Sequence, residues 1–73
     1  MKDKRGRFRA LAEKRVARAL HELHLIGNLA NTSNYSYTKE EADRIVAALE
    51  AEMKLLKGRF AAGTQKGKPT FKL

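Results

Sequence analysis

Cysteine and tryptophan are absent from this 73-residue chain, and proline occurs once. Without cysteine the chain can form neither disulfides nor a thiolate metal site, on which many small secreted domains depend. We therefore expect a cytoplasmic protein. Long apolar runs are also missing, because nothing approaches the roughly 18 consecutive apolar residues of a membrane span or the apolar segment of a signal peptide. The sequence thus predicts neither a membrane span nor export.

Features typical of enzymes are scarce as well. A chain of this length buries only about 60% of its unfolded surface, which leaves no room for a large substrate cleft or a dinucleotide-binding fold. No glycine-rich loop follows a strand pattern, and no serine or histidine lies in a recognisable nucleophile motif. We expect one small domain, residues 1–73, with no enzymatic activity and no cofactor.

Acidic residues are the minority among the charges: eight Asp and Glu stand against sixteen Lys and Arg, which gives a formal net charge of +8. Residues 1–18 carry eight basic and two acidic side chains, and residues 54–73 carry six basic side chains and no acidic one. The net charge is −1 over residues 19–38 and −3 over residues 39–53. Because both ends are basic, the sequence favours a polyanionic partner.

The first periodic segment predicts a helix over residues 8–30. Its apolar residues recur every three or four positions, which is the pattern of one helical face. They are Phe8, Ala12, Val16, Ala19, Leu20, Leu23, Ile26 and Ala30. Gly27 is either a left-handed residue after the helix or a small residue that admits another helix, so we expect the end between Gly27 and Asn31.

The second segment predicts a helix over residues 39–60. Thr38 and Glu41 have the spacing of a capping box, in which each side chain accepts from the other residue's backbone N–H. One apolar stripe follows, and the pairs Glu40/Arg44 and Glu50/Lys54 have the spacing of helical ion pairs. The stripe consists of Ala42, Ile45, Val46, Leu49, Met53, Leu56 and Phe60.

The predicted fold class is all-α, a two-helix antiparallel hairpin. Residues 1–7 form a basic arm, residues 31–38 an ordered connector, and residues 61–73 a flexible basic tail. Two helices rarely supply enough core alone, so we expect completion by a homodimer forming a four-helix bundle, or by a partner. Apolar residues outside the two stripes are candidates for that contact: Leu11, Leu25, Leu29 and Leu55.

Nucleic acid, DNA or RNA, is the expected partner, because the hairpin brings the arm and the tail to one pole. Arg7, Lys14, Arg18 and His21 share the outer face of the first helix, with Arg15 at its edge. An ordinary solvated surface is the alternative interpretation. The expected phosphate-contacting residues are Lys4, Arg5, Arg7, Arg9, Lys14, Arg15, Arg18, Lys57, Arg59, Lys66 and Lys68.

Within the arm, Arg5-Gly6-Arg7 resembles the Arg-Gly-Arg centre of AT-hook peptides. The resemblance covers three or four residues, and Phe8 stands where a proline usually follows that centre. It implies an extended backbone whose arginines enter a narrow minor groove. General phosphate contact is the competing interpretation.

A small protein-binding or inhibitory module is the alternative function, with its basic pole on an acidic or nucleic-acid-binding groove of a partner. Leu25, Leu29, Tyr35 and Tyr37 are the candidate protein-contact residues. Attachment to anionic lipid is a third possibility. His21 and His24 lack the four-residue spacing and the further ligand of a zinc site, so we expect no metal.

Overall fold

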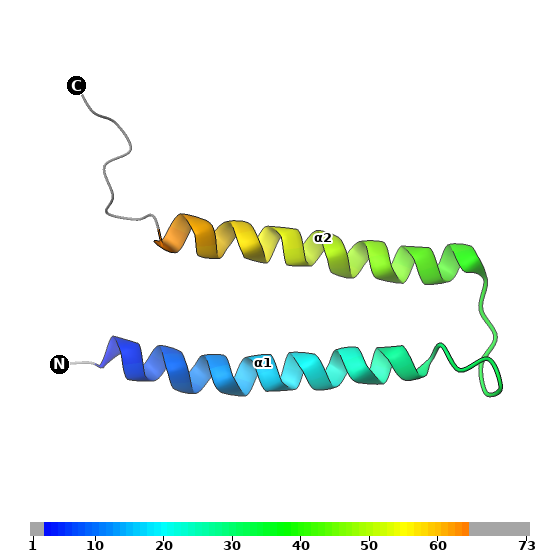
Figure 1. Cartoon of the computed structure of the whole chain (residues 1–73), viewed down its shortest axis with the longest axis horizontal. Coiled ribbons are helices and arrows are strands. Elements are labelled where there is room, and N and C mark those ends of the chain that lie inside the picture. The colour runs from blue at the N-terminus through cyan, green and yellow to red at the C-terminus, as the bar shows by residue number, and fades with distance from the viewer. Residues whose placement is uncertain (1–2, 65–73) are drawn as a thin grey trace, which may run out of the picture. The chain divides into compact units, whose positions relative to one another are not determined.

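The computed structural model describes residues 3–64 and contains, in that range, two α-helices and no strand. Helix α1 comprises Lys4–Asn28 and helix α2 comprises Lys39–Thr64 (Figure 1). The predicted all-α class is confirmed. The chain divides into two units, Met1–Ser36 with α1 and Tyr37–Leu73 with α2, and each is described by itself below.

Helix α1 begins four residues earlier than the periodicity predicts, so most of the predicted basic arm is helical. Asp3 is the N-cap: its Oδ1 accepts from the Gly6 backbone N–H at 2.9 Å, and its carbonyl accepts from Arg7 N at 3.0 Å. A capping carboxylate satisfies amides that have no partner inside a helix. The apolar pattern missed this start because its first residue is Phe8.

The end of α1 at Asn28 lies inside the expected range. Gly27 remains in the helix and does not adopt a left-handed conformation. Instead, the chain leaves the helix through hydrogen bonds between residues three positions apart. Leu29 N donates to Ile26 O and Ala30 N donates to Gly27 O, both at 3.0 Å. These bonds satisfy carbonyl groups that the helix end leaves without partners.

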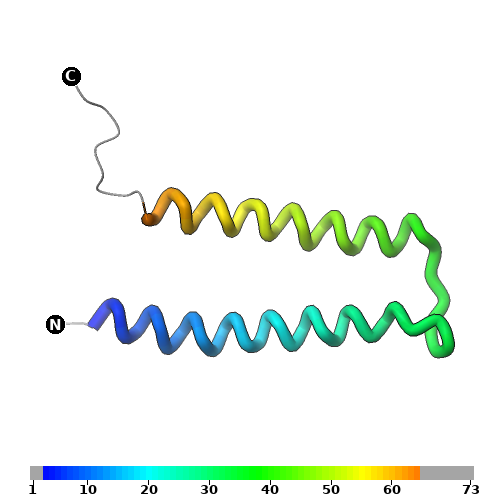
Figure 2. Tube along the Cα trace, in the orientation of Figure 1, coloured from blue at the N-terminus to red at the C-terminus, as the bar shows by residue number. Residues whose placement is uncertain are grey.

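The connector is ordered by Asn31. Its Oδ1 accepts from Ser33 N at 2.9 Å, and its carbonyl accepts from Asn34 N at 3.1 Å and Tyr35 N at 3.0 Å. The trace closes into a tight loop there (Figure 2). This is the Asx-turn chemistry that asparagine offers in place of helix.

Helix α2 begins as predicted. Thr38 Oγ1 accepts from Glu41 N at 3.0 Å, and Glu41 Oε1 accepts from Thr38 N at 2.8 Å. The predicted capping box is therefore confirmed. Of the ion pairs, Lys39 Nζ and Asp43 Oδ2 lie 2.9 Å apart, while within residues 3–64 neither Glu40/Arg44 nor Glu50/Lys54 forms one. Exposed charges gain little from pairing, so sequence spacing alone does not decide which pairs form.

Helix α2 extends to Thr64, four residues beyond the predicted end at Phe60. Ala61 and Ala62 continue it because alanine has the highest helix propensity. The final turn is closed by Thr64 Oγ1, which donates to the Ala61 carbonyl at 3.1 Å. The predicted tail, residues 61–73, thus begins as helix, and its residues 65–73 lie outside the described part of the chain.

No residue between positions 3 and 64 is buried. Leu11, Ala12, Ile26, Ala42 and Leu49 are partly covered, whereas large apolar side chains of both stripes stay exposed. Each helix is therefore held by its backbone and its caps. Neither described helix is long and apolar enough to cross a lipid bilayer.

Candidate nucleic-acid interface

Helix α1 carries seven basic and two acidic side chains, a net charge of +5. At about 100° per residue, five of the basic residues fall within one sector of roughly 100°. We call this sector the cationic face. It consists of Lys4, Arg7, Lys14, Arg15 and Arg18. The earlier helix start adds Lys4 to the face that the sequence predicted.

The basic groups of the cationic face are exposed, and none of them forms an ion pair within the described part of the chain. Among residues 3–64 the ion pair is that of Lys39 with Asp43, and no acidic side chain pairs with an arginine of α1. Glu13 and Glu22 are the acidic residues of α1. The guanidinium groups therefore keep their donors available to an external anion, which arginine binds through two parallel hydrogen bonds.

The structure assigns Arg5 and Arg9 to a different side of α1. They lie one helical turn apart, and the same steps of three and four lead from Arg9 to Ala12 and Val16 on the apolar stripe. The sequence had placed Arg5 in the basic arm and Arg9 in the first turn of the predicted helix. Helix formation instead gives them fixed directions away from the cationic face.

The extended geometry implied by the AT-hook resemblance is not adopted. Arg5-Gly6-Arg7 occupies the first turn of α1, where the Gly6 N–H donates to Asp3 Oδ1. Helical geometry turns the two flanking arginines about 200° apart, so both cannot enter one narrow groove. The helix forms at this tripeptide because Asp3, which the motif does not include, caps its first turn.

The start of α1 is electrostatically unusual. Its first turn contains no acidic residue, although Asp3 caps it from outside. Lys4 and Arg5 therefore stand beside the positive end of the helix dipole, where basic residues are unfavourable. An external phosphate would relieve this repulsion.

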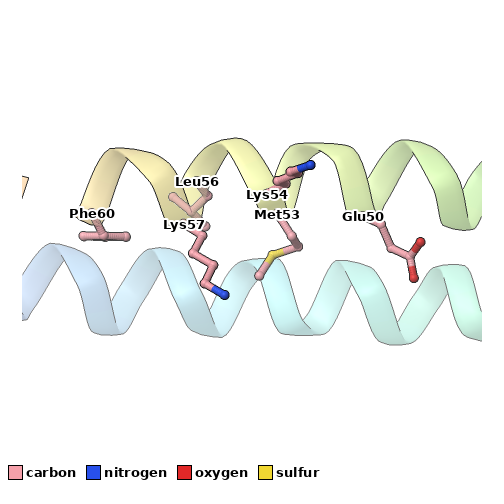
Figure 3. Close-up of a pocket in the computed structure, with 6 residues that line it drawn as sticks. All are labelled: Glu50, Met53, Lys54, Leu56, Lys57 and Phe60. Carbon is pink, nitrogen blue, oxygen red and sulfur yellow. The ribbon is translucent and has the colours of Figure 1, made fainter. Parts of the chain in front are cut away.

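Helix α2 contributes Lys57 and Arg59, and its five basic side chains are balanced by five acidic ones. Lys57 lines a surface pocket on α2, and Figure 3 shows it projecting from the same side as Glu50 and Met53. The pocket is lined by Glu50, Met53, Lys54, Leu56, Lys57 and Phe60. Lys66 and Lys68 fall outside the described residues. The meeting of both basic ends at one pole stays a prediction.

The candidate protein-contact residues divide between the two units. Leu25 shares a sector of α1 with Arg7 and Arg18, and Leu29 is the residue that follows α1. Tyr35 is 50% exposed and Tyr37 41% exposed. Sequence reasoning named these residues, and the structure leaves their apolar surfaces accessible.

Asp3 is the residue that sequence reasoning missed. A short acidic side chain directly before a helix is a capping signal, but Asp3 lies outside the apolar periodicity, whose first residue is Phe8. In the described part of the chain, no group of three or more His, Asp or Glu side chains could hold a metal ion.

No protein-family model matches this sequence, and neither a curated protein nor a solved structure does so.

Proposed function

We propose that the chain is a small non-enzymatic protein that binds DNA or RNA through their phosphates. The observation that carries the proposal is the cationic face of α1, which is exposed and lacks ion pairs to the described carboxylates. Lys4 and Arg18 are fourteen residues apart, so the face extends over about 21 Å of helix. Phosphates on a nucleic-acid backbone are spaced closely enough for several to be contacted along that length.

The proposal includes the antiparallel hairpin. The connector between Asn28 and Lys39 spans at most about 40 Å when fully extended, and the turn at Asn31 shortens it to less than the length of α1, which is about 37 Å. In a parallel arrangement of the two helices, the connector would have to run back along the whole of α1. That arrangement is therefore disfavoured. An antiparallel return brings Lys57 and Arg59 toward the basic start of α1, and a polyanion would relieve the resulting repulsion. Two such hairpins would complete a four-helix bundle.

The test is a mobility-shift series with duplex DNA, single-stranded DNA and RNA at several salt concentrations. Neutralising about six phosphates predicts a slope near −5 in a plot of log affinity against log salt on duplex DNA. A flat salt dependence, or no complex at low ionic strength with any of the three ligands, would contradict the proposal.

A matched pair of variants locates the interface. Replacing Arg7, Lys14 and Arg18 by Gln removes three charges from the cationic face, and we expect at least a tenfold loss of affinity at low salt. The control replaces Lys39, Arg44 and Lys54 by Gln, which removes the same charge from α2. Equal losses in both variants would show attraction by net charge alone.

Protein binding is the second candidate function, and exposed apolar surface is the observation that favours it. Leu25 and Leu29 remain accessible at 44% and 46%, beside a connector that presents Tyr35. Leu25 and Leu29 are four residues apart, and exposed apolar side chains that lie close together mark contact sites. A pull-down after nuclease treatment separates the two functions. A partner kept without nucleic acid and lost on Leu25→Ser or Tyr35→Ser, but not on Arg7→Gln, would favour protein binding.

A further inference from the structure

The large apolar residues of α2 recur in alternating steps of three and four. From Val46 the chain advances three, four, three and four positions, so that the same face is presented on successive turns. This is the spacing of a helix that packs along another helix. We call these residues the α2 seam: Val46, Leu49, Met53, Leu56 and Phe60. None of them is buried, and Met53 and Phe60 are 58% and 54% exposed.

The α2 seam contains a hole of the kind that receives a side chain from a neighbouring helix. Met53, Leu56, Lys57 and Phe60 lie at positions i, i+3, i+4 and i+7, and all four line the surface pocket on α2 (Figure 3). In paired helices, four residues of one helix form such a hole around one side chain of the other. Three of these four residues are apolar, so the hole fits an apolar side chain.

Charged side chains flank the α2 seam on both edges. Glu50 and Lys57 lie seven residues apart on one edge, and Glu52 and Arg59 lie seven residues apart on the other. On each edge the acidic residue precedes the basic one. None of the four belongs to an ion pair within residues 3–64. Their charges are therefore available to a partner helix that carries the opposite order.

We propose that this partner is a second copy of the chain, whose own α2 packs on the α2 seam in the antiparallel direction. Antiparallel helices bring equivalent edges together, so the acidic residue of one copy faces the basic residue of the other. Glu50 faces Lys57 and Glu52 faces Arg59, each twice, because the pair is twofold symmetric. The same alignment places Met53 of each copy in the hole of the other.

Charge selects this alignment, because apolar packing does not distinguish it from its neighbour. Sliding one helix by seven residues pairs the same five large side chains and only exchanges Gly63 for Ala42 at the end of the seam. That shift sets Glu50 and Glu52 opposite the same residues of the second copy, which is repulsive. A parallel pair would align the acidic first half of α2 with itself and the basic second half with itself. The proposed alignment avoids both repulsions.

The α2 pair identifies one contact between the two copies in the proposed four-helix bundle. Five large side chains from each copy make a short interface, so the other contacts of that bundle are needed for its affinity as well. Nucleic acid takes no part in the α2 pair. Its test is therefore independent of phosphate binding.

Charge reversal tests the α2 pair, with self-association measured by sedimentation equilibrium in nuclease-treated samples at low salt. Glu50→Lys and Lys57→Glu should each weaken self-association about tenfold or more, because like charges then face each other twice. An equimolar mixture of the two variants should associate as the natural chain does, since every facing pair is again opposite in sign. The chain that carries both substitutions should recover for the same reason.

Net charge alone gives a different outcome, because the two single variants change it in opposite directions. Arg44→Glu is the matched control for Lys57→Glu, since it makes the same charge change on the side of α2 away from the seam, and it should leave self-association unchanged. Equal losses in these two variants, or a mixture no stronger than the single variants, would overturn the α2 pair. Loss in Lys57→Glu without loss in Glu50→Lys would reject the antiparallel direction. A natural chain that stays monomeric at every concentration would reject the second copy as partner.

Discussion

Asp3 decides where the basic segment becomes ordered. Its carboxylate holds the Gly6 amide at 2.9 Å and fixes the first turn of α1. The same carboxylate occupies the space beside Gly6, where a built Cβ would meet Asp3 Oδ2 and Cγ. A single residue outside the apolar pattern thus gives Arg5 and Arg9 their directions.

Removing this cap is the first prediction. Asp3→Ala should destabilise the start of α1 by about 1 kcal/mol, because the Gly6 amide loses its acceptor. Amide hydrogen exchange of residues 4–8 should accelerate, and helical circular dichroism should fall. Asp3→Asn is the control, since its side-chain oxygen retains the cap. Equal exchange rates in all three proteins would show that Asp3 does not hold the turn.

The two helices differ in how strongly their sequences mark their ends. Helix α2 carries a reciprocal capping box of two bonds, at 2.8 Å and 3.0 Å, and acidic residues in its first turn. Helix α1 has one capping side chain and basic residues in that turn. The acidic side chains in the first turn of α2 suit the helix dipole, whereas the basic side chains in the first turn of α1 oppose it. The sequence therefore marks the start of α2 more clearly.

The capping box yields the second prediction. Thr38→Ala should lower the stability of α2 by about 1 kcal/mol, since the Glu41 amide loses its hydroxyl acceptor. Thermal unfolding followed by circular dichroism measures the loss. Thr38→Ser keeps the hydroxyl and should stay within a few tenths of a kcal/mol of the natural chain. A Ser variant as unstable as the Ala variant would point to the threonine methyl group instead.

In the molecule as a whole, charge repulsion opposes the packing that exposed apolar surface favours. The net charge of +8 disfavours bringing basic segments together, whereas exposed stripes on both helices favour packing. Leu11, Leu29 and Leu55 lie outside the two apolar stripes. These residues are the remaining apolar surface through which two hairpins could form a bundle.

The prediction for the whole molecule is that its thermal midpoint of unfolding depends on protein concentration. If two hairpins form the proposed bundle, the thermal midpoint should rise with protein concentration, because mass action favours the dimer. Circular dichroism melts over a hundredfold concentration range in nuclease-treated samples provide the measurement. Leu11→Ser with Leu29→Ser should abolish the dependence. If the thermal midpoint of the natural chain does not change with concentration, a second copy does not cover the exposed apolar surface. A different partner would then have to cover it.

The sequence by itself determined the all-α class, the start of α2 and the cationic face except for Lys4, because helical periodicity and the capping box are local patterns. The structure decided that the basic arm is helical from Lys4, that α2 continues to Thr64, and that Lys39 pairs with Asp43. These features depend on which of several available hydrogen bonds and ion pairs form. Residue spacing permits all of them, and only the folded backbone selects among them.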